Sequence, residues 1–195
     1  MTDVITFTGA QSTGKTTMRK ALVEYLQNEG NKVISQYYGI HESVARDAKN
    51  FGFTINEGTT FDTQYYIANR FMVADMETRK IAERNRSDFI VLDRSVLDVI
   101  PYSNVAGDIT PNQKRIISDM LLQHYKLYPT DLIYCTPIEY IEDDQLRSTD
   151  KEFQDKIITK FKELLVAVAD FSPAIVLEYM SPEDRLEIIK GHLNL

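Results

Sequence analysis

The feature that most constrains the fold is the segment 9–16, GAQSTGKT, which matches the pattern G-x-x-x-x-G-K-[ST] at every fixed position. A short apolar run at 4–8 precedes it, and an amphipathic pattern over 14–28 follows it. Between a strand and a helix, the backbone N–H groups of such a loop point inward and hold phosphate groups. A chance match in a glycine turn is the alternative, and the flanking elements weigh against it. The sequence therefore predicts a P-loop that binds a nucleoside triphosphate.

Individual residues of this loop have different expected roles. Lys15 is expected to reach the β- and γ-phosphates, and the Thr16 hydroxyl is expected to be a Mg²⁺ ligand. ATP and Mg²⁺ are therefore the expected cofactors. The residues expected to bind the nucleotide are Gly9, Gln11, Ser12, Thr13, Gly14, Lys15, Thr16 and Thr17.

Short apolar runs alternate with helical patterns along the whole chain, which favours an α/β fold with a parallel sheet. The expected strands are 4–8, 32–37, 89–92, 132–135 and 174–177. Most of them are continuously apolar, as strands buried on both faces should be. We expect a three-layer P-loop domain with a five-stranded parallel sheet flanked by helices, spanning 1–195 as a single unit with a lid-like segment at about 139–150.

Helix signals lie between these runs. Gly30 stands where the first helix should end, Pro111 opens another helix, and Ser181 followed by proline opens the last one. A helix of similar pattern carries apolar residues over 153–168. A long helix after Thr60 should bury one apolar face, made of Phe61, Tyr65, Ala68, Met72 and Met76.

A carboxylate ends the third expected strand at Asp93. The carboxyl ends of parallel strands form the ligand crevice of an α/β sheet. Asp93 is therefore expected to face Mg²⁺, directly or through water. A helix cap or a surface turn is the alternative for this residue.

The stretch 93–95, Asp-Arg-Ser, resembles an element of deoxynucleoside kinases, and its Asp-Arg part resembles thymidylate kinases. The longer run 92–103, together with 42–46 and 143–150, is similar to the P-loop "AAA domain" kinase-like family. That family includes the ribosylnicotinamide kinase domain of bacterial NAD regulators and many phage proteins. The resemblance implies a strand order of 2-3-1-4-5 and phosphoryl transfer to a small-molecule nucleoside or nucleotide acceptor.

The resemblance also implies roles on the acceptor side. Glu42 would be the base for an acceptor hydroxyl, Gln64 and Arg70 would bind the acceptor, and Arg94 would hold the acceptor or the transferring group. Each role has a plainer alternative. Glu42 and Arg46 are spaced to pair on a helix, and one glutamine on a helix is commonly solvated. Tyr65 could stack on a ring or belong to the core.

Arg147 lies in the polar segment 139–150, where similar kinases carry a mobile lid. A lid arginine can close on the transferring phosphoryl group and neutralise its charge. An ordinary surface loop is the alternative. The expected catalytic set is thus Lys15, Asp93, Arg94, Arg147 and Glu42.

Composition narrows the function classes. The 22 basic and 29 acidic residues give a formal net charge of −7, which disfavours a nonspecific nucleic-acid binder. One cysteine allows no internal disulfide, and no apolar run could span a membrane, so a reducing, cytoplasmic location is expected. The oligomeric state stays open, with a homodimer among the alternatives. Rival functions are a P-loop ATPase that switches a partner and a kinase of modified bases in DNA.

Overall fold

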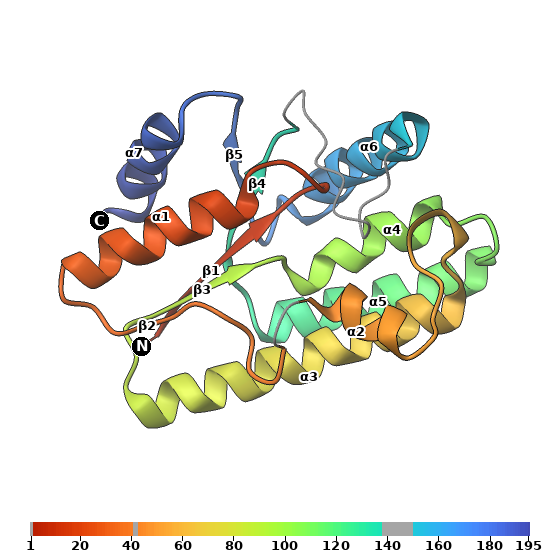
Figure 1. Ribbon diagram of the computed structural model, residues 1–195, viewed down its shortest axis with the longest axis horizontal. Helices are drawn as coiled ribbons and strands as arrows, with labels where there is room; N and C mark the ends of the chain where they lie inside the picture. The colour runs from red at the N-terminus through yellow and green to blue at the C-terminus, as the bar shows by residue number, and fades with distance from the viewer. Residues whose placement is uncertain (1, 41–42, 138–149) are drawn as a thin grey trace.

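A parallel sheet of five strands forms the centre of the computed structural model, which describes residues 2–40, 43–137 and 150–195 (Figure 1). The strand order is β2-β3-β1-β4-β5, as the family resemblance implied. All paired neighbours run parallel. The strands are β1 (Asp3–Thr8), β2 (Val33–Ile34), β3 (Phe89–Asp93), β4 (Asp131–Cys135) and β5 (Ile175–Leu177).

The second strand is shorter than the sequence predicted. An apolar and aromatic pattern suggested a strand over 32–37, but only Val33 and Ile34 pair with β3. This edge strand has one neighbour, and the chain leaves the sheet after Ile34 to run along the top of β3. The apolar character of Tyr37 reflects burial in that loop, where its side chain is 6% exposed, and not a place in the sheet.

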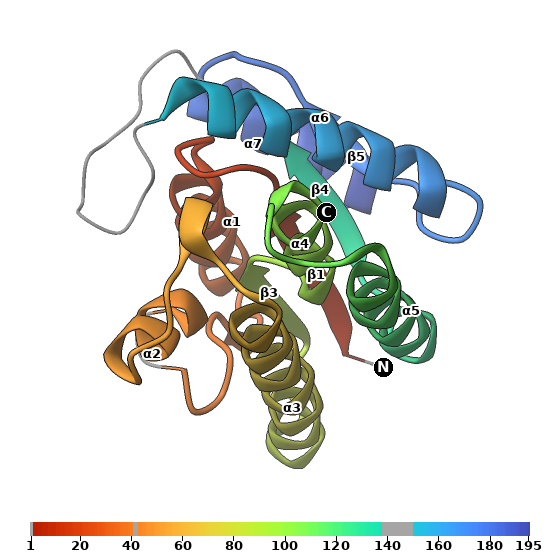
Figure 2. The same ribbon diagram turned by 90° about the vertical axis from the view of Figure 1, so that its right-hand side faces the viewer.

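Helices cover both faces of the sheet, so the predicted three-layer α/β architecture is confirmed (Figures 1 and 2). On one face lie α1 and α7, and on the other lie α3, α4, α5 and α6, with α2 packed beside α3. In the described ranges, no helix has the length and apolar composition of a membrane span. The bounds are α1 (Lys15–Asn28), α2 (Val44–Asn50), α3 (Phe61–Asn85), α4 (Val99–Val105), α5 (Pro111–Leu127), α6 (Lys151–Val168) and α7 (Pro182–Leu193), with short 3₁₀ turns η1 (Asn56–Gly58) and η2 (Val96–Asp98).

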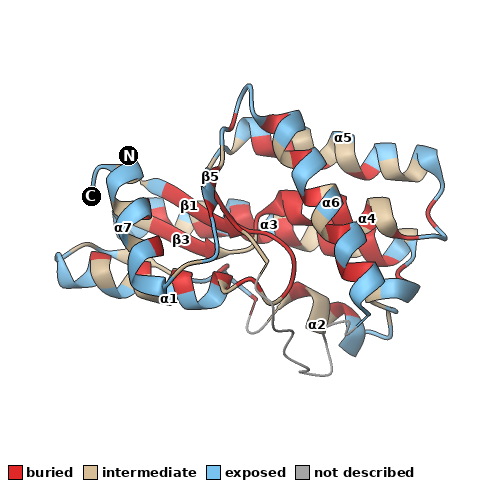
Figure 3. Cartoon of the chain, turned by 90° about the horizontal axis from the view of Figure 1, so that it is seen from above, coloured by how far each residue is buried: buried red, intermediate tan, exposed pale blue. Residues whose placement is uncertain are grey.

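The alternation of side chains along the strands divides the core between the two faces of the sheet. The strands β1 and β3 at the centre of the fold are coloured mostly as buried in Figure 3. Ile5 and Phe7 of β1 pack with Leu22 under α1 and α7, while Leu92 and Leu132 face the helices on the other side. The single cysteine, Cys135, closes β4 on the α1 side and is fully buried. Burial raises the pKa of this thiol to about 11.

The buried face of α3 differs from the predicted apolar stripe. Tyr65 and Met76 were expected inside, yet they are 43% and 39% exposed. Polar residues take their place: Gln64 donates a hydrogen bond to Thr59 Oγ1 at 2.7 Å, and Asp75 is buried against Arg79. Apolar periodicity misplaced this face because it does not count polar side chains that find partners.

The sheet brings the two sequence motifs together. Phe7 of β1 is in register with Asp93 of β3, so the strand ends lie side by side. The strand β1 lies between β3 on one side and β4 on the other, and the strand order reverses direction at β1. The carboxyl end of β1 is therefore a topological switch point. Ligands of open α/β sheets bind at such a point.

Candidate functional site

The P-loop joins β1 to α1 and depends on two glycines. Gly9 and Gly14 have φ values of 133° and 82°, which side chains rarely allow. A Cβ on Gly9 would also lie 2.7 Å from the carbonyl oxygen of Cys135, at the end of β4. Gly9 therefore lets the loop pass directly over the strand ends, where its N–H groups can surround phosphates.

Lys15 is the first residue of α1 and lies buried beneath the loop. Its Nζ donates hydrogen bonds to the carbonyl oxygen of Ala10 and to Thr13 Oγ1, the latter at 3.2 Å. Burial, and then the positive charge of Arg94, lower the pKa of Lys15 to about 8. A polyanion beside this ammonium group would favour its charged form, so the pocket is suited to phosphate.

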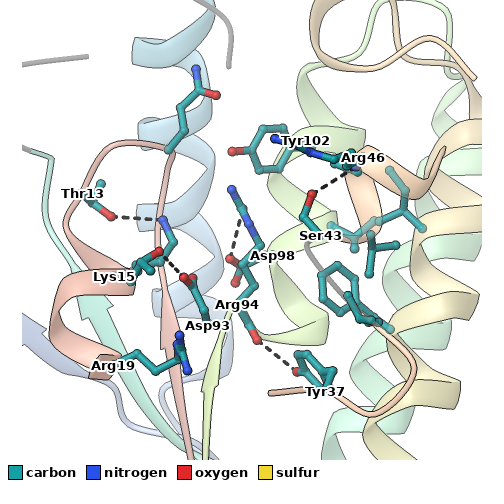
Figure 4. Close-up of a pocket in the computed structure, with 18 of the residues that line it drawn as sticks. Thr13, Lys15, Arg19, Tyr37, Ser43, Arg46, Asp93, Arg94, Asp98 and Tyr102 are labelled. Carbon is teal, nitrogen blue, oxygen red and sulfur yellow. Dashed lines mark hydrogen bonds and ion pairs between the residues drawn. The ribbon is translucent and has the colours of Figure 1, made fainter. Parts of the chain in front are cut away.

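Thr16 and Asp93 meet across the gap between the P-loop and β3. The hydroxyl of Thr16 donates a hydrogen bond to Asp93 Oδ2 (Figure 4). A hydroxyl and a carboxylate are hard oxygen donors, and Mg²⁺ in phosphate sites takes only one or two protein ligands with waters and phosphate oxygens. These two residues therefore fit the magnesium site that the sequence predicted.

Arg94 follows Asp93 with a left-handed backbone, φ 80°. Its N–H donates to the carbonyl oxygen of Phe7 at 2.8 Å, and its own carbonyl accepts from the Tyr37 hydroxyl at 3.0 Å. Its guanidinium Nη1 lies 3.6 Å from Asp98 Oδ2, and its Cζ lies 5.9 Å from the centre of the Tyr102 ring. The side chain is thus held at the junction of β1, β3 and α4.

Asp98 is a buried carboxylate that sequence reasoning did not assign to the site. Its Oδ1 accepts from the Thr8 hydroxyl at 2.5 Å and from the Ser95 N–H at 3.3 Å. Burial raises the pKa of Asp98 to about 6, while the charges of Arg94 and Lys15 oppose that rise. The positive charges of Arg94 and Lys15 thus favour the ionised form of the buried Asp98 carboxylate.

A cavity of about 640 Å³ connects these groups. One wall is the P-loop, residues 11–17, together with Arg19, whose guanidinium donates to the carbonyl oxygen of Ser35. The opposite wall comes from the loop after β2, from α2, from η1 and from α3 and α4. Most of its side chains are apolar or aromatic, namely Tyr37, Ile40, Val44, Ala45, Ile55, Ile67, Phe71, Val99 and Tyr102. Its polar members are Gln36, Ser43, Asn56 and Gln64, and Arg46 of α2 adds a cation.

Gln64 lines the far wall of the cavity from α3. Its side chain is 4% exposed, so the alternative of a solvated surface glutamine is wrong. The hydrogen bond from its Nε2 to Thr59 fixes the amide and leaves its carbonyl oxygen as an acceptor. The neighbouring Tyr65 stacks on Phe61, with ring centres 5.4 Å apart, and does not line the cavity.

The other expected site residues divide into three groups. Gln11, Ser12, Thr13, Gly14 and Thr17 line the cavity with Lys15 and Thr16, whereas Gly9 supports the loop from beneath. Arg70 is not brought into the cavity, because its Nη2 donates to the carbonyl oxygen of Gly39 at 2.9 Å. Glu42 and Arg147 lie outside the described residues.

Among the cavity residues that the sequence analysis did not assign to the site, Arg19 and Asp98 carried a signal in the sequence, whereas Tyr37 did not. Arg19 lies one helical turn after Lys15, so it faces the same cavity. Asp98 is a charged residue inside the apolar run 96–100, where a carboxylate must have a partner. Tyr37 gave only an aromatic residue near a strand, which does not distinguish it from core.

The sequence matches the family model described as "AAA domain" over residues 4–185. No curated protein matches the chain. Its fold is similar to NadR protein in complex with NAD and AMP-PNP, at 13% identity and a TM-score of 0.74. That match covers 100% of this chain and 50% of the other, so the chain spans about half the length of NadR.

Two further solved structures are similar over nearly their whole length. Deoxyadenosine kinase from M. mycoides, with dCMP and dCDP bound, is 14% identical with a TM-score of 0.61, over 98% of both chains. Thymidylate kinase from Ehrlichia chaffeensis is 16% identical with a TM-score of 0.68, over 100% of this chain and 99% of that one. At these identities the likeness shows the fold.

Proposed function

The chain belongs to the AAA-domain family, and from this premise we propose that it is a MgATP-dependent kinase that transfers the γ-phosphoryl group to a nucleoside or nucleotide. The observation that carries the proposal is one continuous cavity with two different ends. At one end Lys15 and Asp93 supply charge and Thr16 supplies a hydroxyl. At the other end Gln64 supplies a fixed amide in a largely apolar wall. The second end gives room for an acceptor beside the phosphates, which hydrolysis of ATP alone does not require.

On the nucleotide side, the P-loop N–H groups and Lys15 bind and orient the phosphates. Thr16 and Asp93 would hold Mg²⁺, which neutralises phosphate charge when bound. The similar fold of NadR, solved with AMP-PNP, supports an adenine nucleotide as the phosphoryl donor.

On the acceptor side, Gln64 would read the base through its free acceptor, and apolar Ile67 and Phe71 would pack against a planar ring. Arg94 would hold the transferring group. The acceptors considered are a deoxynucleoside, a deoxynucleotide or nicotinamide riboside, in line with the similar folds of NadR, deoxyadenosine kinase and thymidylate kinase. Arg70, tied to Gly39, would support this wall from outside.

Two proposed residues rest on the sequence alone. Glu42 is proposed as the base for an acceptor hydroxyl, and Arg147 as an arginine that closes on the phosphoryl group. Glu42→Gln should lower kcat by about 10²–10⁴-fold if the acceptor is a hydroxyl. With a phosphate acceptor, which already attacks through an anionic oxygen, the same variant should keep its rate.

The direct test is a panel assay. The protein is incubated with MgATP and nucleosides, nucleotides or nicotinamide riboside, and products are identified by mass. A product heavier than its acceptor by one phosphoryl group is expected for one class. ATP consumption without any phosphorylated product would favour the rival ATPase, and activity only on DNA would favour a kinase of modified bases. The Lys15→Ala protein is the negative control.

A further inference from the structure

The backbone of Arg94 is held in a conformation that its residue type rarely adopts. A non-glycine residue at φ 80° persists only where its surroundings fix it. Both of its backbone polar groups are used: the N–H bonds to Phe7 of β1, and the carbonyl accepts from Tyr37. Tyr37 is itself fixed, because its ring packs edge-on against Phe71 with centres 5.6 Å apart.

The side chain of Arg94 is held as firmly as its backbone. Its guanidinium lies 3.6 Å from Asp98, four residues further along the chain, and beside the face of Tyr102. The Arg94 side chain is 31% exposed, whereas that of Asp98 is 2% exposed. Both residues line the cavity, but Arg94 exposes far more of its side chain to a ligand there. Arg94 can therefore contact that ligand, while the buried Asp98 is placed to hold the guanidinium.

The two carboxylate oxygens of Asp98 contact different parts of the site, Oδ1 the end of β1 and Oδ2 the Arg94 side chain. Oδ1 accepts from the hydroxyl of Thr8, the residue directly before the P-loop glycine. Among the described residues, Oδ2 has no hydrogen-bond partner and faces the Arg94 guanidinium. The carboxylate therefore ties the Arg94 cation to the strand that carries the P-loop (Figure 4).

We propose that Asp98 and Tyr37 are positioning residues that hold the Arg94 guanidinium in line between the P-loop and the acceptor end of the cavity. Tyr37 fixes the backbone of Arg94, and Asp98 fixes its side chain. The cation is thereby aligned before ligands bind, which spares reorganisation during transfer. This inference rests on the proposed kinase function, but the alignment itself is a property of the protein without ligands.

The charges around Asp98 agree with this role. Lys15 and Arg94 are both cations near the same point, and their repulsion would push the mobile guanidinium away from the phosphates. Asp98 counters that repulsion from a buried site. Although burial raises its pKa to about 6, the carboxylate is ionised at pH 8, so the contact with Arg94 is an ion pair under assay conditions.

A double-mutant cycle at pH 8 tests the proposal with the acceptor that the panel assay identifies. Asp98→Asn keeps the side-chain size and should lower kcat by about 10²-fold, the order expected for a misplaced group, with little change in KM for ATP. In an Arg94→Ala background, Asp98→Asn should change kcat less than about threefold, since the residue it positions is gone. The exposed carboxylate Asp119 gives the control Asp119→Asn, which should match wild type.

The proposal would be overturned if the losses of kcat in the two single variants multiply in the double variant. Asp98 would then affect the enzyme independently of Arg94, as a residue that only supports the general fold does. Wild-type kcat in Asp98→Asn would overturn it as well. If Asp98→Asn does not fold, Tyr37→Phe decides. That variant loses a single hydroxyl and should lower kcat in the wild-type background but not in the Arg94→Ala background.

A second readout needs no turnover. The Arg94 Nε–H signal in ¹⁵N NMR spectra, assigned by its loss in Arg94→Lys, should move and broaden in Asp98→Asn and in Tyr37→Phe. An unchanged signal in both variants would overturn the positioning role even in an active enzyme. If no acceptor is phosphorylated, the proposed function fails, and this signal still tests the alignment of Arg94.

Discussion

The two ends of the cavity are built in different ways. The nucleotide end is built mainly from one continuous segment, residues 11–17, to which β3 adds Asp93. The acceptor end collects single side chains from separate elements, among them Gln36, Ser43, Asn56, Gln64 and Val99. A backbone cradle fixes one ligand group, phosphate, for any chain that can form it. Scattered side chains can change one by one, so the second end can be adapted to different acceptors on the same fold.

The largest effect should come from the nucleotide end. Lys15→Ala should lower kcat by about 10³-fold or more, because the ammonium group meets charge that grows during transfer. Burial lowers the pKa of Lys15 to about 8, so its charged form costs stability at pH 7 and the fold should persist without it. Turnover and melting temperature measure the two effects.

The exposed Lys20 lies on the same helix, so Lys20→Ala is the matched control and should behave as wild type. If a folded Lys15→Ala protein keeps wild-type turnover, the P-loop does not take part in catalysis, and the contrast between the two ends of the cavity is wrong.

Asp93→Asn should come next, with a loss of about 10²-fold in kcat and a higher magnesium requirement. The amide keeps the size of the side chain but removes the charge that would face the proposed metal beside Thr16. A magnesium titration at fixed ATP measures the change, and Asp155→Asn on the exposed face of α6 serves as control. A titration curve identical to wild type would place Asp93 outside the metal site.

Gln64→Leu probes the acceptor end. It should lower kcat/KM for the acceptor by about 10- to 100-fold, because a base that loses its hydrogen bond is left unpaired in a buried site. ATP affinity should stay unchanged, and this contrast with Lys15→Ala is the sharpest form of the comparison. Gln123→Leu, at an exposed position on α5, is the control. Equal loss of ATP and acceptor binding would show that the two ends are not separable.

The smallest expected effect is one of pH on nucleotide affinity. Above its pKa of about 8, Lys15 is neutral in the free protein, and a bound polyphosphate must restore the proton. Affinity for ATP should therefore fall as pH rises, by about tenfold between pH 7 and 9. A fluorescent ATP analogue can report Kd over this range. A flat profile would mean that Lys15 keeps its proton throughout, against the lowered pKa.

The sequence predicted the loop between β1 and α1 well because its information is local. A glycine-rich loop, its strand and its helix are adjacent in the chain, and Asp93 is marked by the abrupt end of an apolar strand. Gln64 and Tyr65 show the limit of that approach. Gln64 is buried and Tyr65 is exposed because of Thr59 and the way α3 packs against distant elements, which no periodicity within the helix reveals.

The helix α4 and the turn η2 were missed for a related reason. Pro101 and the apolar run around it do not form a clear helical pattern, yet a proline is tolerated in the first turn of a helix. Asp98 ends η2 and caps the start of this region through Ser95. Its role became visible only when the fold brought Thr8 and Arg94 to its two oxygens.

The buried thiol of Cys135 has a practical consequence. The chain contains a single cysteine, and it lies where β4 ends beneath the P-loop glycine, with its pKa raised to about 11. A thiol reagent can reach the buried thiol only when β4 separates locally from the sheet. The rate at which Cys135 is labelled therefore measures how often that local opening occurs. The same protein, without any tag, can thus report whether added MgATP slows the opening of β4.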